Sequence, residues 1–275
     1  MRPGAIVGAG LLGIVAVVAA LAPLIGPGDP LDIVARPMLP PFEDAAHPFG
    51  TDRLGRDVLS GLLHGARVSL FVGFVAALAT LGFGTLVGLL AGFAGGAVDA
   101  VLMRFTEAVQ TVPTFLLALA LTGALGPSLG TVILAIALAS WPLSARLVRA
   151  EVMRLRTLDF VAAARLAGLS PAAVAVVVVL PGAMQPVVAL FGVAVAEAIL
   201  VESALAFLGL SDPNVTSWGA MVAEGRSLVR SAPHLVLLPG AAIALTVLGV
   251  SLVGDRFAAL PVSVRSRRRR FGRLG

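Results

Sequence analysis

Long apolar blocks alternate with shorter polar segments along this chain. A helix needs about 20 apolar residues to cross the hydrocarbon core of a bilayer, and six blocks approach this length. We predict membrane spans at residues 5–25, 69–93, 112–125, 129–147, 187–208 and 235–253. The third block is short, so its helix is expected to begin earlier, within residues 104–111. The pattern predicts an all-α polytopic membrane protein.

The composition supports this class and narrows the chemistry. Hydrophobic residues make up 58% of the chain and charged residues 13%, whereas soluble domains carry about 25% charged residues. The chain contains no cysteine, which excludes disulfides and thiolate metal sites. All 20 basic residues are arginine, and a Walker A loop needs a lysine to reach nucleotide phosphates. If ATP drives this protein, a separate polypeptide therefore hydrolyses it.

The arginines predict how the chain is oriented. With both termini in the cytoplasm, 14 arginines lie inside and 6 outside, as the positive-inside rule favours. The arginine run at residues 267–270 is expected to contact lipid headgroups rather than nucleic acid. We predict a multi-pass protein of the cell (inner or plasma) membrane with two cytoplasmic termini.

The predicted spans divide the chain into four regions. Residues 1–25 form an N-terminal transmembrane helix, and residues 26–66 an extracytoplasmic segment. Residues 67–255 form a core with five further helices and a cytoplasmic loop at 148–183, followed by a basic cytoplasmic tail at 256–275. The extracytoplasmic segment is rich in proline, which favours extended and turned backbone. Within it, residues 56–63 are predicted to form a helix along the membrane surface.

Three features outside the cytoplasmic loop indicate contacts. Asp52, Arg53, Arg56 and Asp57 alternate in charge, and they either pair with one another or form a contact surface for an extracytoplasmic partner. Glycines at positions 84, 88 and 92 recur every four residues, a spacing that lets helices approach closely, within the bundle or against a second subunit. Trp218 is expected to anchor at the outer membrane interface.

The cytoplasmic loop carries the most informative spacing. It contains Ala162, Ala163, Ala164, Gly168, Leu180 and Pro181. Small alanines allow a short helix to seat closely against a partner, and a glycine ends such a helix because it tolerates left-handed dihedral angles. Serine followed by proline at 170–171 is typical of the start of a second helix. We predict a rigid foot of two short helices.

This spacing resembles the cytoplasmic loop of binding-protein-dependent ABC importer permeases, whose pattern is E-A-A, three residues, G, nine residues, I-x-L-P. Ala162 stands where the family usually has glutamate. Residues 49–70 are similar to the G-T-D-x-x-G-R-D signature region of the dipeptide/oligopeptide/nickel permeases, of their second permease type. Residues 202–210 and 217–219 resemble the same family's E-x-x-L-S-F-L-G-L and S-W-G segments, with Ala206 in place of serine.

The resemblance implies a type I ABC importer permease (MetI-like) fold with six transmembrane helices. It implies a homologous permease, two ATPase subunits that bind ATP and magnesium, and an extracytoplasmic substrate-binding protein as partners, within the lipid bilayer. The foot would couple to an ATPase and rock the permease pair between inward-facing and outward-facing states. The chain itself would be non-catalytic and hold no cofactor or metal. The implied substrates are dipeptides or oligopeptides, with nickel, glutathione or another small solute as alternatives.

Glu202 is the candidate for the translocation path. Glu197 and Glu202 are the only carboxylates well inside an apolar block, and an ionisable residue at membrane depth is a functional candidate. Five residues apart, they do not share a helix face, and Glu202 belongs to the family-like segment. It would hold a substrate ammonium or an arginine of the second permease; the alternative is a structural pairing near the outer boundary.

Two other protein classes fit less well. A stand-alone secondary transporter would be expected to carry more intramembrane ionisable groups and an internal inverted repeat, and the sequence indicates neither. A membrane-embedded enzyme would need a nucleophile, base or metal ligands clustered at one depth. The histidines at 47, 64 and 234 are scattered, so their spacing indicates no metal site.

Overall fold

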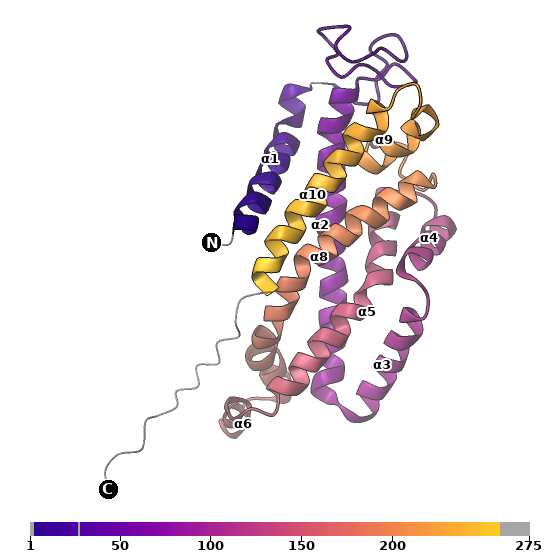
Figure 1. Cartoon of the computed structure of the whole chain (residues 1–275). Helices are drawn as coiled ribbons and strands as arrows, with labels where there is room; N and C mark the ends of the chain where they lie inside the picture. The colour runs from indigo at the N-terminus through magenta and orange to yellow at the C-terminus, as the bar shows by residue number, and fades with distance from the viewer. Residues whose placement is uncertain (1–2, 27, 259–275) are drawn as a thin grey trace, which may run out of the picture.

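The computed structural model describes residues 3–26 and 28–258, and long helices run through most of them (Figure 1). In chain order the helices are α1 (Pro3–Ile25), α2 (Val58–Ala94), α3 (Gly96–Gln110), α4 (Thr114–Leu125), α5 (Leu129–Leu155), α6 (Asp159–Leu166), α7 (Pro171–Ala173), the π-helix η1 (Val174–Val179), α8 (Leu180–Phe207), α9 (Trp218–Gly225), the 3-10 turn η2 (Arg226–Leu228) and α10 (His234–Ala258). The centre of the bundle is formed by α2, α5 and α8, and α1 packs against α10 and α2.

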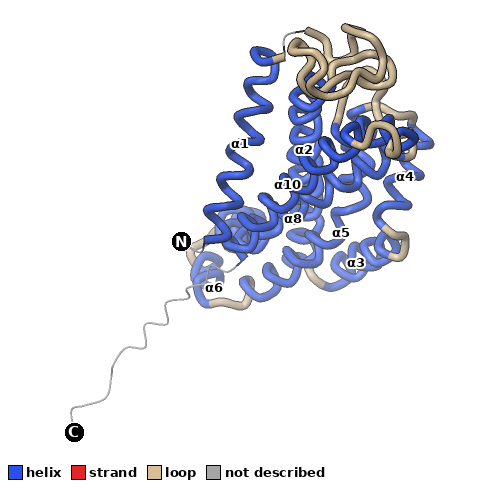
Figure 2. The backbone as a smooth tube through the Cα atoms, turned by 45° about the horizontal axis from the view of Figure 1, so that its top comes forward, coloured by secondary structure: helices blue, strands red, loops and turns tan. Residues whose placement is uncertain are grey.

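The two ends of the bundle differ. Residues 28–57 and α9 lie at one end, which we call the cap end (Figures 1 and 2). The short helix α6 lies at the opposite end, the foot end, toward which the start of α1 and the finish of α10 also point. The termini of the described chain therefore share the foot's side of the bundle. Residues 259–275, with most of the predicted basic tail, lie outside the described residues.

Five helical segments among the described residues are long and apolar enough to span a membrane, and a sixth span exists only if α3 and α4 are counted together. These two helices meet at an angle of 85°. Pro113 lies at the break and has no N–H group to continue a helix. The prediction that the third span continues back through residues 104–111 was therefore wrong, because those residues belong to α3, which runs in another direction.

The helix α2 also differs from its prediction. It begins at Val58 and runs unbroken for 37 residues, so the predicted surface helix at 56–63 is the first part of the second span. Asp57 caps this start, because its side chain accepts a hydrogen bond from the Ser60 N–H at 2.8 Å. At 1.5 Å per residue the helix is roughly 56 Å long, well beyond the ~30 Å hydrocarbon core. It thus connects the cap end to the foot end.

Other boundaries extend beyond their predictions. The fourth span continues to Leu155, and the fifth is continuous from Pro171 through η1 into α8. The extracytoplasmic region predicted at 26–66 ends as a loop at Asp57, and α10 runs three residues past the predicted core boundary at 255. These shifts share one cause: apolar content locates the part of a helix within the bilayer, whereas capping residues set its ends.

The glycines of α2 allow it to pack directly on α5. A β-carbon added to Gly84 would lie 1.8 Å from the Ser144 hydroxyl oxygen, and one on Gly88 would lie 2.4 Å from the Ala145 carbonyl oxygen. The third glycine of the series, Gly92, approaches the Arg149 carbonyl oxygen, at 2.9 Å from the added carbon. The predicted close packing along this series is confirmed, and it lies within the chain.

We predict that Gly88→Leu destabilises the protein, because the side chain would have to push α2 and α5 apart. Overpacking of this kind typically costs about 1–3 kcal/mol. The matched control is Gly123→Leu in α4, where an added β-carbon has no neighbour within 4 Å. The measurement is the temperature at which each detergent-solubilised variant loses its monodisperse size-exclusion peak. Equal midpoints for Gly88→Leu and wild type would show that the glycine contact contributes nothing.

Candidate functional site

The foot, which we define as residues 159–181, is held to the bundle by a small apolar cluster. Val161 is the one buried residue of α6. It belongs to the same core as Leu155 at the end of α5 and as Val174 and Val179 of η1, and all four side chains are buried. One valine thus anchors a helix whose remaining surface is half-buried or exposed.

The turn after α6 explains the spacing of its glycine. Gly168 adopts a φ of +85°, a region that side-chain-bearing residues rarely occupy. Its N–H donates to the Arg165 carbonyl at 3.0 Å, and the Leu169 N–H donates to the Ala164 carbonyl at 3.3 Å. This pair of bonds is a Schellman motif, which ends a helix by satisfying its last carbonyl groups. The predicted glycine stop is confirmed.

The second half of the foot is only partly as predicted. Ser170 accepts a hydrogen bond from the Ala173 N–H at 3.3 Å, and Pro171 occupies the first helical position, as its sequence indicates. This helix is not a separate short element, however, because α7 continues through η1 into α8. Leu180 and Pro181 therefore lie at the start of the long helix α8. The foot therefore consists of one short helix, α6, followed by the first turns of the long helix that continues as α8.

The outer surface of the foot is rich in apolar residues, beside the exposed charged residues Asp159 and Arg165. Ala162, Ala163 and Gly168 are exposed, and Leu166 is 90% exposed. Phe160 and Leu169 are also exposed large hydrophobic residues. A cluster of this kind at the end of a bundle is typical of a protein–protein contact. The structure thus brings the alanines and the glycine of the predicted coupling motif onto one exposed element.

Two arginines connect the foot to the end of α2. Arg156, just after α5, donates from Nη1 to the Gly92 carbonyl oxygen at 2.9 Å, where a cation is favoured at the end of a helix. The Arg165 guanidinium of α6 lies over the Phe93 ring at 5.8 Å. These two contacts attach the last turn of α2 to the segment after α5 and to α6.

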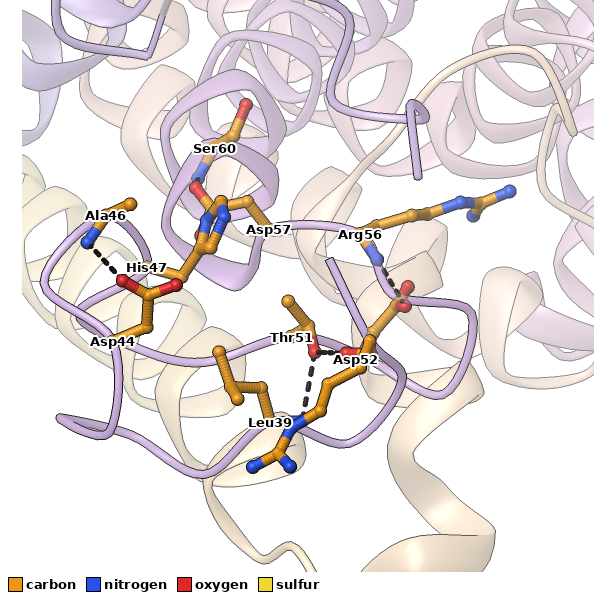
Figure 3. Close-up of polar contacts among 10 residues, drawn as sticks. Leu39, Asp44, Ala46, His47, Thr51, Asp52, Arg56, Asp57 and Ser60 are labelled. Atoms are coloured by element: carbon orange, nitrogen blue, oxygen red, sulfur yellow. Dashed lines mark hydrogen bonds and ion pairs between the residues drawn. The ribbon is translucent and has the colours of Figure 1, made fainter. Parts of the chain in front are cut away.

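At the cap end, buried polar contacts fix the loop that precedes α2 (Figure 3). Thr51 is fully buried; its hydroxyl donates to the Arg36 carbonyl at 2.6 Å and accepts from the Leu39 N–H at 3.0 Å. Asp52 accepts hydrogen bonds from the N–H groups of Leu54 at 2.7 Å and Arg56 at 2.9 Å. These side-chain contacts add to the backbone hydrogen bonds of the loop, such as the one from the Thr51 N–H to the Leu39 carbonyl at 3.1 Å.

Two glycines of the same loop leave no room for a side chain. Gly50 and Gly55 have φ angles of +73° and +86°. An added β-carbon would lie 2.1 Å from the Leu39 carbonyl oxygen at the first position and 2.3 Å from the Ala35 carbonyl oxygen at the second. The glycines, the threonine and the aspartates of the G-T-D-x-x-G-R-D segment therefore hold this loop in one compact conformation.

The four charged residues of this segment do not pair with one another in the described structure. Asp52 and Asp57 accept backbone N–H groups, whereas Arg56 lies 3.5 Å from the Glu224 carboxylate of α9. Burial raises the pKa of Glu224, and the neighbouring Arg56 partly offsets this effect. Arg53 is exposed. All four line one cavity of about 410 Å³ between the loop and α9, so the predicted contact residues share one recess.

A second set of polar contacts holds α9 against α8 and α2. The Ser217 hydroxyl donates to the Glu202 carboxylate at 2.6 Å and accepts from the Ala220 N–H at 3.1 Å, so one serine both caps α9 and binds the acid. Glu202 is only 5% exposed. A β-carbon on Gly219 would lie 2.6 Å from the Ser203 Cα, so the two helices touch directly.

Trp218 is an internal residue, and its predicted place at the membrane interface was wrong. Only 3% of it is exposed. Its backbone N–H donates to the Ser69 hydroxyl at 3.1 Å, and its ring N–H donates to the Leu62 carbonyl at 3.0 Å. The indole thus locks α9 onto the start of α2. An amphipathic ring suits a membrane interface, and it equally suits a buried site that offers one hydrogen-bond acceptor. The presence of a tryptophan in the sequence does not distinguish these two environments.

Glu197 and Glu202 contact different elements, in agreement with their spacing. The Ser140 hydroxyl of α5 donates to Glu197 at 3.1 Å, whereas Glu202 contacts the start of α9. The prediction that Glu202 lies on the translocation path is not tested by these contacts. They show a carboxylate enclosed by its own chain.

Sequence reasoning missed Asp212, which ties the loop after α8 to α5. Its carboxylate accepts from the Leu129 N–H at 3.1 Å and from the Asn214 N–H at 2.9 Å. The hydrogen bond from Asn214 holds the pKa of this carboxyl below its usual value. The Asp-Pro-Asn sequence at 212–214 is typical of a turn and was the available signal, but it does not identify the distant partner.

Comparison with known proteins agrees with this architecture. Residues 84–262 match the family described as binding-protein-dependent transport system inner membrane component. The chain is 35% identical over 258 residues to the dipeptide transport system permease protein DppC of Haemophilus influenzae, covering 92% of this chain and 88% of that protein. It is 40% identical over 243 residues to the di/tripeptide transport system permease protein DppC of Pseudomonas aeruginosa, covering 86% of this chain and 80% of the relative.

Among solved structures, the fold is similar to a chain of the MetNI methionine ABC transporter in inward-facing conformations. The TM-score is 0.57 at 16% sequence identity, covering 71% of this chain and 94% of the other. This likeness supports the predicted type I ABC importer permease (MetI-like) fold, and the sequence relatives support the predicted family. The chain belongs to the family of binding-protein-dependent transport system inner membrane components and is a membrane-spanning permease subunit of an ABC importer.

Proposed function

We propose that this permease imports dipeptides or oligopeptides delivered by an extracytoplasmic binding protein. The observation that carries the proposal is the near full-length similarity to permeases named for dipeptide and di/tripeptide transport. The chain would form half of the translocation path, beside a homologous permease. Nickel, glutathione or another small solute is the alternative cargo of the same architecture.

We further propose that both termini and the foot lie in the cytoplasm. Five of the 14 arginines assigned to the inside belong to α3, α5 and the foot, and the ends of the described chain point toward the foot end (Figure 1). The cap end would face the binding protein. The recess that holds Asp52, Arg53, Arg56 and Asp57 is the proposed contact, because it presents charges of both signs beside the outer ends of α2 and α9.

The foot is the proposed docking element for an ATPase subunit. Its exposed alanines and Leu166 provide an apolar surface without a partner in the described chain. ATP and magnesium would be bound in two partner ATPases, consistent with the absence of lysine from this chain. The permease would accordingly hold no cofactor and catalyse no reaction. Closure of the ATPases would move the foot and, through Arg156 and Phe93, the end of α2.

The first experiment is to purify the tagged full-length chain from its native membrane and identify the proteins that accompany it. We expect a second six-span permease and an ATPase with a Walker A lysine. The complex, reconstituted with its binding protein, should take up labelled dipeptide only with ATP, and excess unlabelled dipeptide should compete. Competition by nickel or glutathione but not by dipeptide would show that one of these solutes, rather than a peptide, is the substrate. Uptake by the lone chain without ATP would indicate a secondary transporter.

We predict that Gly168→Val reduces uptake and ATPase binding while leaving membrane insertion intact. A β-branched residue at a positive φ is strained, at a typical cost of about 1–3 kcal/mol, and no neighbouring atom lies near enough to clash. The matched control is Gly168→Asn, because asparagine tolerates the left-handed region. Co-purified ATPase and peptide uptake are measured per inserted chain. Normal values for the valine variant would remove the glycine turn from the coupling mechanism.

Glu202→Gln separates the two roles considered for this carboxylate. The change removes the charge but leaves an acceptor for the Ser217 hydroxyl, so a loss of at most ~1 kcal/mol of stability is expected. If Glu202 acts on the translocation path, uptake changes while the complex assembles normally. The matched control is Glu197→Gln, which alters the other carboxylate of α8. Dissociation of the Glu202→Gln complex would instead assign the residue to structure alone.

A further inference from the structure

A long apolar groove runs along the outside of the bundle. It has a volume of about 920 Å³ and is lined by residues of α1, α2, α8 and α10. Phe71, Phe74 and Leu78 of α2 form part of its wall, and each is about half exposed. The Phe74 ring meets the Phe191 ring of α8 edge-on at 5.5 Å between centroids. The groove therefore presents bulky apolar side chains that the described chain leaves uncovered.

A second hollow, with charged residues among its mostly apolar lining, adjoins the cap end of this groove. It has a volume of about 470 Å³, shares Phe71 with the groove, and is lined also by Asp29, His64 and Arg67. Arg67 is exposed and has no hydrogen bond or ion pair with any residue that the structure describes. His64 contacts the Gly26 carbonyl oxygen at 3.0 Å, and the Asp29 carboxylate accepts from the Leu31 N–H at 2.9 Å. Both signs of charge are thus available to a ligand in one hollow.

The hollow and the groove lie along one face of α2. The α2 residues that line them include a series separated by three or four positions, namely His64, Arg67, Phe71, Phe74, Leu78, Gly82 and Thr85, and Val68, Leu70 and Leu81 beside it. At 1.5 Å per residue, the apolar part from Phe71 to Thr85 is roughly 21 Å long. This exceeds the ~15 Å depth of one leaflet, half of a hydrocarbon core of about 30 Å. The face therefore changes from charged to apolar in the direction that leads from a membrane surface inward.

We propose that this face binds a phospholipid whose headgroup carries both a phosphate and an ammonium group. The phosphate would lie at Arg67, the ammonium at Asp29, and an acyl chain in the apolar groove along Phe71, Phe74 and Leu78. Charge complementarity selects the headgroup, because the hollow presents a guanidinium and a carboxylate together. The proposal concerns the lipid partner of the permease and does not depend on which solute it transports.

The order of polarity favours a lipid over a helix of a second subunit. A transmembrane helix is apolar along its length and would leave the charges of the hollow beside its end without specific partners. A phospholipid has its charged and apolar parts arranged end to end, as the groove does. A phospholipid thus complements both parts of this face with a single molecule.

The test is native mass spectrometry of the purified permease complex after delipidation and titration with phosphatidylethanolamine. Gly82→Leu fills the groove; an added β-carbon at Gly82 meets no atom within 4 Å, so folding is preserved. Arg67→Gln removes the headgroup cation. The matched controls are Gly123→Leu in α4, which is equally open, and Arg230→Gln, an exposed arginine outside the hollow. We expect Arg67→Gln to lower retention of one lipid about fivefold, the effect of one cation near a membrane surface. Gly82→Leu should also lower retention, because it occupies the space of the acyl chain, and each control should match wild type.

Three results would overturn the proposal. The first is equal lipid retention by wild type, Gly82→Leu and Arg67→Gln. The second is efficient cross-linking of Gly82→Cys to the second permease in native membranes, which would make the groove a subunit interface. Because this chain contains no cysteine, no other position of it contributes to that cross-link. The third is retention of phosphatidylglycerol equal to that of phosphatidylethanolamine, which would show that the site does not recognise an ammonium group.

Discussion

The close approach of α2 and α5 is the constraint on which the rest of the bundle depends. Without a hydrophobic driving force between helices in lipid, association relies on packing and on polar contacts. The glycines of α2 bring its backbone against that of α5 from Gly84 to Gly92. At the foot end of this contact the Arg149 guanidinium binds both oxygens of Asp99 at 2.5 and 2.6 Å. This ion pair thus fixes the position of α3 relative to the closely packed helices α2 and α5.

The cap end is organised by buried polar groups together with a small hydrophobic cluster around Val58, Ala232 and Leu235. Thr51, Ser217 and Glu202 are all buried and hydrogen-bonded. A buried polar group that loses its partner costs about 1–3 kcal/mol, so these contacts restrict the loop and α9 to one arrangement. Segments that are far apart in sequence and similar to one permease family therefore converge as a single structural unit at the ends of α2 and α8.

The sequence predicts the class, the number of apolar blocks and the local structure of the foot, because hydropathy, glycine and capping residues act over a few neighbours. Gly168 and Ser170 behave as expected for this reason. The burial of Trp218 depends on contacts between distant segments, which periodicity does not encode. For the same reason, the sequence does not reveal the hydrogen-bond partners of Glu202 and Asp212. The bend between α3 and α4 had a visible signal in Pro113, since proline lacks the N–H group that a continuing helix needs.

The unbroken helix α2 has a mechanical consequence. Its first turn is capped within the rigid loop at Asp57, and its last carbonyls are bound by Arg156 beside the foot. A rod roughly 56 Å long amplifies small rotations: a tilt of about 5° about one end displaces the other by about 5 Å. If α6 receives the movement of an ATPase as proposed, a push on it at the ångström scale would therefore be large enough to change the aperture at the opposite end of α2.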